Sequence, residues 1–197
     1  MEKLFREAGG DTGGLATLTP VSEDPEAVGP IQAADAILGQ GEQLLVVLSD
    51  EQYSRKLSLA MNSSIGEHYR HCLEHFQSLL NAVELDRVDY DRRQRDPQVE
   101  TQRWKALQLT GALQRRLREI SEVILARRII AACQVNYCPT TSFPTQSSVA
   151  REMVYVVAHA IHHYALIAIL ARSMSISLPA HFGVAPSTLS HRGDLPR

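Results

Sequence analysis

The sequence predicts an all-α fold, a bundle of four helices with a short extended or hairpin segment before the last helix. Two observations support this prediction. Apolar residues recur at the three- and four-residue spacing of a helix face in several long stretches. The stretch at residues 149–171 is apolar on nearly every side and contains no Pro or Gly, which is typical of the central helix of a packed bundle. With 197 residues the chain is long enough for one domain with a sizeable core.

The first helix is expected at residues 30–48. Pro30 suits a first helical position, and apolar residues follow at helical spacing through Leu48. Residues 49–62 are polar and lack this period, so we expect them to form a connector.

The second helix has a clear start at Ser64. Ser64 and Glu67 form a capping box, in which each side chain can bond the other residue's backbone amide. The apolar face of this helix is formed by Ile65, Tyr69, Cys72, Phe76, Leu79 and Leu80. His68, His71 and His75 lie beside that face, and helix geometry places His68 and His75 nearer to it than His71. The helix can therefore offer one imidazole to a site in the core, but its geometry does not choose which one.

A charged connector follows at residues 84–96. Its simplest interpretation is a solvated loop. The alternative is that Tyr90, Arg92 or Arg93 lies at the mouth of a pocket and contacts an anionic group of a substrate.

The third helix is expected at residues 97–121, because Asp96 and Pro97 are typical of a helix start. Residues 122–137 are ambiguous, since they are rich in Val, Ile and Leu but alternate poorly. Within this segment we expect extended chain, or a short hairpin, over residues 127–137. The last helix then begins after a turn-rich segment.

Three histidines, His159, His162 and His163, interrupt the apolar last helix. His159 and His163 are four residues apart and lie one turn above each other, so two neutral imidazoles can bind one metal ion. With one histidine of the second helix they would form a three-imidazole site. The alternative for the pair is a set of buried histidines that satisfy each other without metal. His162 is expected to pack in the core or to support a ligand, and Glu152 is a candidate to orient a ligand or the substrate.

Composition and charge exclude several classes of protein. The net charge of −2 gives no general attraction to nucleic acid or to acidic membranes. The 3 cysteines are sparse and odd in number, which indicates a reducing, cytoplasmic setting. The last helix is long enough to span a membrane, but three histidines at bilayer depth disfavour that interpretation. We therefore expect neither nucleic acid nor a membrane as partner.

Two segments resemble a known family. They are Ser64-Ile-Gly-Glu-His-Tyr-Arg-His71 and the later Arg151-Glu-Met-Val-Tyr-Val-Val-Ala-His-Ala-Ile-His-His163. In order and placement they resemble the DinB/YfiT-like superfamily of predicted metal-dependent enzymes. The resemblance implies a DinB-like four-helix bundle with a three-histidine metal site. Matched to this sequence, the ligands are His71, His159 and His163.

The resemblance also implies a function. Three neutral ligands leave a divalent ion with its full charge and an open position, which suits activation of water or a thiol. Zinc is expected first, with nickel or iron as alternatives, and characterised relatives use a low-molecular-weight thiol as cosubstrate. The resemblance further implies a small-molecule substrate and a homodimer.

The leading hypothesis is a metal-dependent S-transferase or hydrolase that attacks an electrophile. The alternatives are a metal- or ligand-binding bundle without turnover and a structural or interaction protein. The last helix departs from the family, which often continues His-His-Arg-Gly-Gln, because Tyr164, Ala165 and Leu166 follow the histidines here. No general base is identified.

The domain limits follow from these patterns. Residues 30–175 are expected to form the bundle. Residues 1–29 are rich in Gly, Pro, Thr and Asp without a sustained period, so we expect a poorly ordered N-terminal arm. Residues 176–197 contain scattered Pro and Gly and are expected to form an irregular C-terminal tail.

Overall fold

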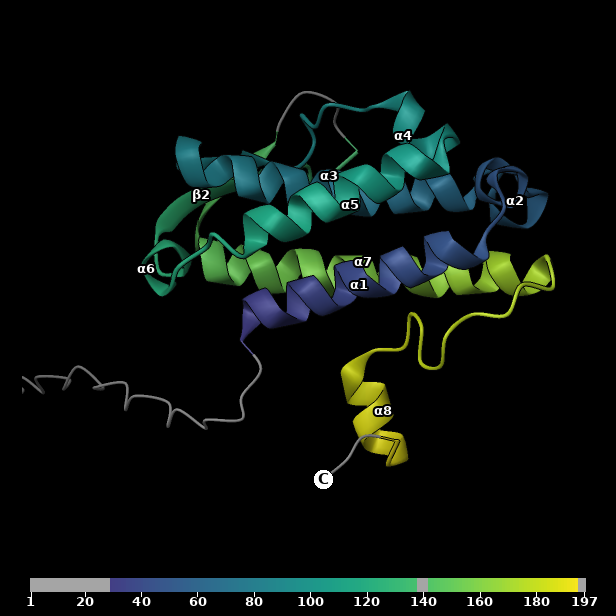
Figure 1. The fold of residues 1–197 in the computed structure, drawn as a ribbon. Coiled ribbons are helices and arrows are strands. Elements are labelled where there is room, and N and C mark those ends of the chain that lie inside the picture. Colours follow the sequence, from purple (N-terminus) through teal and green to yellow (C-terminus); the bar gives the residue numbers. More distant parts are fainter. Residues whose placement is uncertain (1–28, 138–141, 195–197) are drawn as a thin grey trace, which may run out of the picture.

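The computed structural model describes residues 29–137 and 142–194. Four long helices form a bundle in which α3 and α5 lie over α1 and α7 (Figure 1). The helices are α1 (Pro30–Val47), α3 (Ile65–Leu85), α5 (Arg103–Leu117) and α7 (Val149–Ser173). Each packs against two others, and α3 lies along α7. The prediction of an all-α four-helix bundle is confirmed. The predicted N-terminal arm, apart from Gly29, lies outside the described residues.

The sequence signals at the helix starts act as expected. Pro30 is the first residue of α1. At the start of α3 the Ser64 hydroxyl accepts from the Glu67 amide at 3.1 Å, and the Glu67 carboxylate accepts from the Ser64 amide at 2.9 Å. Ser148 caps α7 by accepting from the amide of Arg151. These bonds satisfy amides that have no partner inside their helix.

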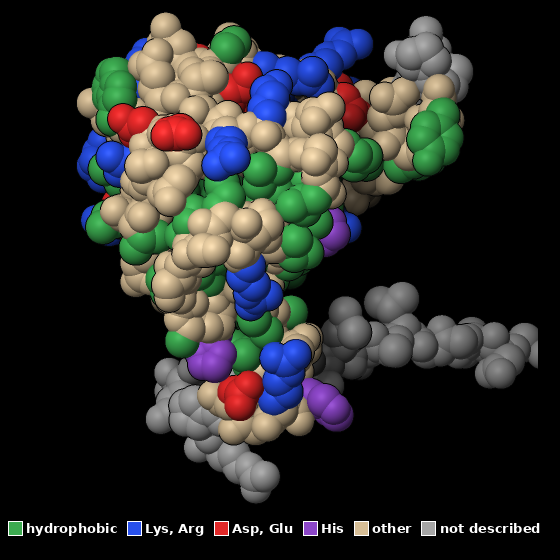
Figure 2. Space-filling view, turned by 90° about the vertical axis from the view of Figure 1, so that its right-hand side faces the viewer, with side chains coloured by type: hydrophobic (Ala, Val, Ile, Leu, Met, Phe, Trp, Pro, Cys, Tyr) green, Lys and Arg blue, Asp and Glu red, His purple; other side chains and the backbone are tan. Residues whose placement is uncertain are grey.

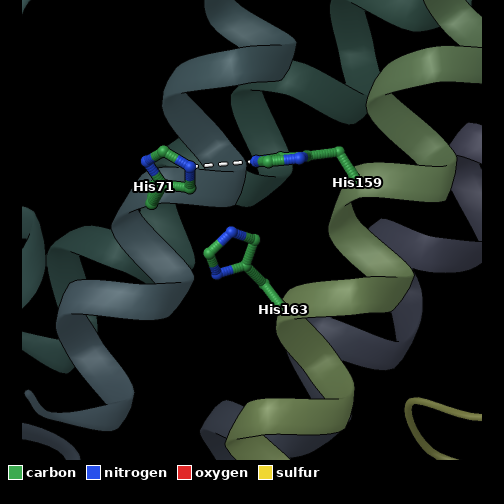
Figure 3. A group of neighbouring side chains, drawn as sticks. All are labelled: His71, His159 and His163. Carbon is green, nitrogen blue, oxygen red and sulfur yellow. Dashed lines mark hydrogen bonds between the residues drawn. The ribbon is translucent and has the colours of Figure 1, made fainter. Parts of the chain in front are cut away.

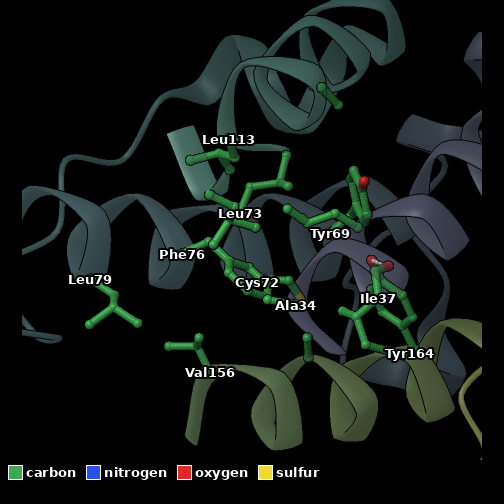
Figure 4. Close-up of a cluster of buried hydrophobic side chains, with 14 of the residues drawn as sticks. Ala34, Ile37, Tyr69, Cys72, Leu73, Phe76, Leu79, Leu113, Val156 and Tyr164 are labelled. Atoms are coloured by element: carbon green, nitrogen blue, oxygen red, sulfur yellow. Dashed lines mark hydrogen bonds between the residues drawn. The ribbon is translucent and has the colours of Figure 1, made fainter. Parts of the chain in front are cut away.

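The core lies between the four helices and includes three tyrosines with at most 1% of their surface exposed, of which Figure 4 labels Tyr69 and Tyr164. The Tyr69 hydroxyl on α3 hydrogen-bonds the Thr110 hydroxyl on α5 at 2.8 Å. The Tyr164 hydroxyl on α7 donates to the carbonyl of Ile37 on α1 at 3.0 Å. The third is Tyr53, whose hydroxyl donates to the carbonyl of Val99 at 2.6 Å. Each bond satisfies a polar group that burial would otherwise leave unpaired.

The core helix α7 is also long and apolar enough to cross a membrane, judged by length and composition alone. Its buried face packs against α1 and α3, as expected for the central helix of a bundle.

A three-stranded sheet lies at one end of the bundle. The strands are β1 (Arg87–Asp89), β2 (Arg128–Cys133) and β3 (Phe143–Ser148). β2 and β3 pair antiparallel, with Arg128 opposite Ser148. β2 confirms extended chain within residues 127–137, but the hairpin is longer than predicted, because its second strand β3 lies in the segment that was expected to be turn-rich. β1 pairs parallel to β2 and was not predicted, because three residues in a charged connector carry no strand period.

The structure corrects the predicted third helix. It is divided into α4 (Pro97–Thr101) and α5, with Gln102 between them in an extended conformation (φ −117°, ψ 98°). α5 also ends at Leu117, earlier than expected. The short helix α6 (Glu122–Leu125) then occupies the start of the segment that the sequence left ambiguous.

Short helices also occur where connector and tail were expected. The predicted connector contains α2 (Asp50–Ser54), capped by Ser49, and the 3₁₀ turn η1 (Ser58–Ala60). The predicted irregular tail contains α8 (Pro186–Arg192). One or two turns are too short to produce a readable apolar period, so the sequence pattern did not reveal them.

Candidate metal centre

Three histidines meet between α3 and α7. His71 comes from α3, and His159 and His163 come from successive turns of α7; their rings point toward one another (Figure 3). One ring nitrogen from each lies within 4.8 Å of the others. The Nε2 atoms of His71 and His159 are 2.9 Å apart and share a hydrogen bond. The structure thus brings together the three histidines that the family resemblance gives as metal ligands.

The geometry and the protonation of these side chains fit a metal site. Tetrahedral zinc bound by imidazoles places the ligand nitrogens about 3.3 Å apart. This value lies between the 2.9 Å that separates the Nε2 atoms of His71 and His159 and the 4.8 Å limit for the whole group. Burial lowers the pKa of His71 to about 2 and that of His163 to about 3, and it also lowers the pKa of His159. Neutral imidazoles with free lone pairs are the form that binds a metal ion.

His75, one of the two alternatives on α3, is not among the three histidines whose ring nitrogens converge, although its ring contacts those of His71 and His159 with centroids 4.4 and 4.3 Å apart. It is only 3% exposed, as its place near the apolar face predicted. Its Nδ1 donates to the backbone carbonyl of His71 at 2.9 Å, and its ring stacks on Tyr90 at 5.2 Å. Burial lowers the pKa of His75 to about 3. His75 therefore supports the wall behind the cluster.

His68, the other alternative, hydrogen-bonds a proposed ligand. Its Nδ1 lies 3.1 Å from Nδ1 of His163, and its Nε2 lies 2.9 Å from the Ser63 hydroxyl. That hydroxyl donates to the carbonyl of Ala60 at 2.7 Å, so it accepts from Nε2 of His68. Nδ1 of His68 then carries a lone pair, and the proton of the shared bond belongs to Nδ1 of His163. Nε2 of His163 is left with its lone pair available for an ion.

Arg93 contacts the cluster from the connector after β1. Its Nη2 lies 3.2 Å from Nδ1 of His71, its Nη1 bonds the carbonyl of Tyr90, and its Nε lies 3.5 Å from the carboxylate of Glu74. A guanidinium only donates, so Nδ1 of His71 accepts and Nε2 of His71 holds the ring proton. An ion at Nε2 of His71 requires that proton to move to Nδ1, which displaces Arg93 from it.

A polar cavity of about 340 Å³ opens beside the cluster. His68, His71 and His163 line it, together with Ser63, Glu67, Arg70, Arg93 and Arg95. Arg70 pairs with Glu74 and Glu100, whereas Arg95 is exposed. Of the three residues expected at a pocket mouth, Arg93 lines this cavity, Tyr90 is buried behind it, and Arg92 is exposed.

The structure places two other residues near the cluster, His162 and Glu152, and the packing expected of His162 is wrong. His162 is exposed and only touches the edge of the His163 ring, so it neither packs in the core nor hydrogen-bonds a ligand. Glu152 is 1% exposed and accepts hydrogen bonds from Tyr90 at 2.8 Å and Ser147 at 2.6 Å. A third bond comes from Arg151 at 2.8 Å, and among the described residues Glu152 makes no hydrogen bond to His71, His159 or His163.

Tyr155 is a site residue that sequence reasoning missed. Its ring stacks on His159, with centroids 5.7 Å apart and planes at 26°, and the guanidinium of Arg151 lies over the Tyr155 ring, 5.5 Å from its centroid. The signal was present in the sequence, since Tyr155 precedes His159 by four residues on the same helix face.

Comparisons with known proteins agree with this architecture. The family model of the DinB superfamily matches residues 40–167. Two solved structures from Bacillus subtilis are similar in fold, and both fall below 20% sequence identity to this chain. The DinB-like protein YjoA has a TM-score of 0.59 and 18% identity over 78% of this chain and 97% of its own. YfiT, reported as a probable metal-dependent hydrolase with an unusual four-helix bundle topology, has a TM-score of 0.51 and 17% identity over 77% and 93%.

A curated relative matches over a shorter stretch. FK506-binding protein 5 of Rhizopus delemar is 36% identical over 104 residues, which are 53% of this chain. The match spans only 27% of that protein's length.

Proposed function

Because the chain belongs to the DinB superfamily, we propose that His71, His159 and His163 hold a divalent metal ion in an enzyme. Zinc is the first candidate, with nickel or iron as alternatives, since imidazole suits all three. The reaction is attack of water or of a low-molecular-weight thiol on an electrophilic small molecule. The description of YfiT as a probable metal-dependent hydrolase supports the water reaction, and the thiol reaction rests on the family resemblance.

The observation that carries this proposal is the convergence of three neutral imidazoles on one point between α3 and α7. No carboxylate belongs to this three-histidine group, so the ion's charge is not offset. When bound, such an ion lowers the pKa of a coordinated water or thiol and thereby supplies a nucleophile at neutral pH.

The other side chains of the cavity have roles that their positions suggest. His68 holds His163 in the tautomer that keeps Nε2 free. Arg95 at the exposed rim and Arg93 at the inner wall provide positive charge for an anionic group of the substrate. The volume of about 340 Å³ suits a small molecule.

One observation favours a second candidate, a metal- or ligand-binding bundle without turnover. Among the described residues that line the polar cavity, Glu67 is the one carboxylate, and it is held by the helix cap and by Lys56 at 3.0 Å. Hydrogen bonds and the ion pair with Lys56 lower its pKa even though burial opposes them. A carboxylate engaged in this way is a poor general base.

Metal analysis and titration of the untagged protein test the proposal. We expect one equivalent of zinc to bind the wild-type chain, and His159→Ala and His163→Ala to abolish this binding. His162→Ala is the matched control, because this histidine is exposed and adjacent. Equal zinc binding by all four proteins would overturn the proposed site.

A screen of thiols and water against electrophiles, run with metal-loaded and metal-free protein, then separates the two candidates. Activity that requires both the metal and His159 supports an enzyme. Metal binding without any such activity favours the second candidate.

A further inference from the structure

A second, apolar cavity adjoins the polar one. Its volume is about 330 Å³. Its apolar lining comes from the turn before α3 and from the C-terminal half of α7, and comprises Leu59, Ala60, Met61, Leu166, Ile169 and Leu170. The end of the molecule where α2 and the end of α7 lie shows hydrophobic side chains gathered at the surface (Figure 2).

The two cavities share two side chains. Ser63 and His68 line both of them, and His68 is the residue that hydrogen-bonds His163. A molecule in the apolar cavity is therefore separated from the candidate metal centre by one imidazole. This adjacency is the main reason to treat the two cavities as parts of one site.

The backbone that forms the apolar cavity is strained. Met61 (φ 52°) and Asn62 (φ 59°) are consecutive residues in the left-handed region, which is unfavourable for residues other than glycine. Backbone bonds between Leu57 and Ser63 at 3.0 Å and between Asn62 and Leu57 at 3.1 Å hold the turn closed. The turn leaves Met61 96% exposed, although burial would favour this side chain. Strain and exposed apolar surface at one place are typical of a binding site.

We propose that this cavity binds the apolar part of the substrate whose reacting group lies at the candidate metal centre. The inference rests on the proposed function and narrows its substrate class. The substrate is an amphipathic small molecule, with an electrophilic group beside an alkyl or aryl chain, and any anionic group lies toward Arg93 and Arg95. A concave space of this volume suits part of a small molecule, and the two lining side chains that it shares with the polar cavity favour that occupant over a second protein.

Alkyl hydroxamates test the inference, because the hydroxamate group binds zinc and the chain length can be varied. Dissociation constants are measured by calorimetry on the zinc-loaded full chain, from acetohydroxamate to octanohydroxamate. If the tail enters the apolar cavity, affinity should rise about fourfold for each added methylene until the cavity is filled.

The variants Ile169→Ser and Leu59→Ser remove apolar lining at positions that are 51% and 56% exposed, where folding tolerates a polar side chain. We expect both to flatten the dependence on chain length and to leave the affinity for acetohydroxamate unchanged. Val154→Ser is the matched control, since Val154 is 59% exposed on the same helix but outside the cavity. It should retain the wild-type dependence.

The outcomes separate this inference from the proposed function. Equal affinity for all chain lengths in the wild-type protein, or an unchanged dependence in both lining variants, would overturn the apolar subsite and leave the metal centre standing. A chain that binds no zinc would overturn the metal centre and this inference together.

Discussion

The hydrogen bond from His163 to His68 makes a sharp prediction about metal affinity. His68→Ala removes the acceptor of the Nδ1 proton of His163, which is 3.1 Å away, and breaks the connection to Ser63. Loss of such a supporting bond typically weakens metal binding by about 10–100-fold. The pair lines a cavity that water can enter, and water can replace part of the lost bond. We therefore expect the lower end of this range, about tenfold or about 1.4 kcal/mol.

Competition with a chromophoric chelator at neutral pH measures this effect directly. His68→Gln should recover most of the zinc affinity, because its amide oxygen can accept the same proton. His162→Ala is the control, since its ring touches His163 without a hydrogen bond, and it should bind zinc as the wild-type protein does. The absorption spectrum of the cobalt-substituted protein should change only in the His68 variants. Wild-type affinity in His68→Ala would refute the proposed support, and so would a His68→Gln variant as weak as His68→Ala.

Three other predictions follow. Gly39→Ala should stabilise the protein by about 0.5–1 kcal/mol, since nothing lies within 4 Å of the added methyl group. Gly41→Ala should destabilise it by about 1–3 kcal/mol, because that methyl group would overlap the buried hydroxyl of Tyr69. Urea denaturation measures both, and effects of the same sign would contradict the packing described for α1. Arg93→Gln should tighten zinc binding several-fold, because it removes a positive charge and lets an amide oxygen accept the Nδ1 proton of His71; the same chelator titration would contradict this if affinity fell. The metal-free protein should lose stability as the pH falls from about 6.5 toward 3, because burial keeps the pKa of His71 at about 2 and that of His163 at about 3 while the unfolded chain takes up protons near pH 6.5. Replacing both histidines by Asn should reduce this dependence of the urea midpoint on pH without abolishing it, because burial also lowers the pKa of His75 and of His159. An unchanged slope would contradict the contribution of His71 and His163.

The apolar run of α7 and the capping box at Ser64 were enough to predict the bundle, because both signals are local and strong. The break at Gln102 and the strand β1 could not be predicted. They depend on packing against residues far away in the sequence, and neither changes the local apolar period.

For the site, the spacing of His159 and His163 predicted their proximity. The choice among the histidines of α3 needed the family resemblance, since position on the helix favoured His68 and His75. His75 lies as deep as its position predicts, but its Nδ1 bonds its own helix and its ring packs on Tyr90. Proximity to the apolar face therefore identified His75, the most buried histidine of α3. It did not identify His71, whose ring nitrogen lies beside those of His159 and His163.

The contact between Arg93 and His71 also has a consequence for the order of binding. Before an ion binds, one donor of this guanidinium is occupied by an imidazole nitrogen. Binding of a metal ion at Nε2 of His71 moves the ring proton to Nδ1, which then no longer accepts from Nη2 of Arg93. This Nη2 group becomes free to face the cavity. The metal-loaded protein should therefore bind a negatively charged ligand more tightly than the metal-free protein does, so that the metal ion binds before the substrate.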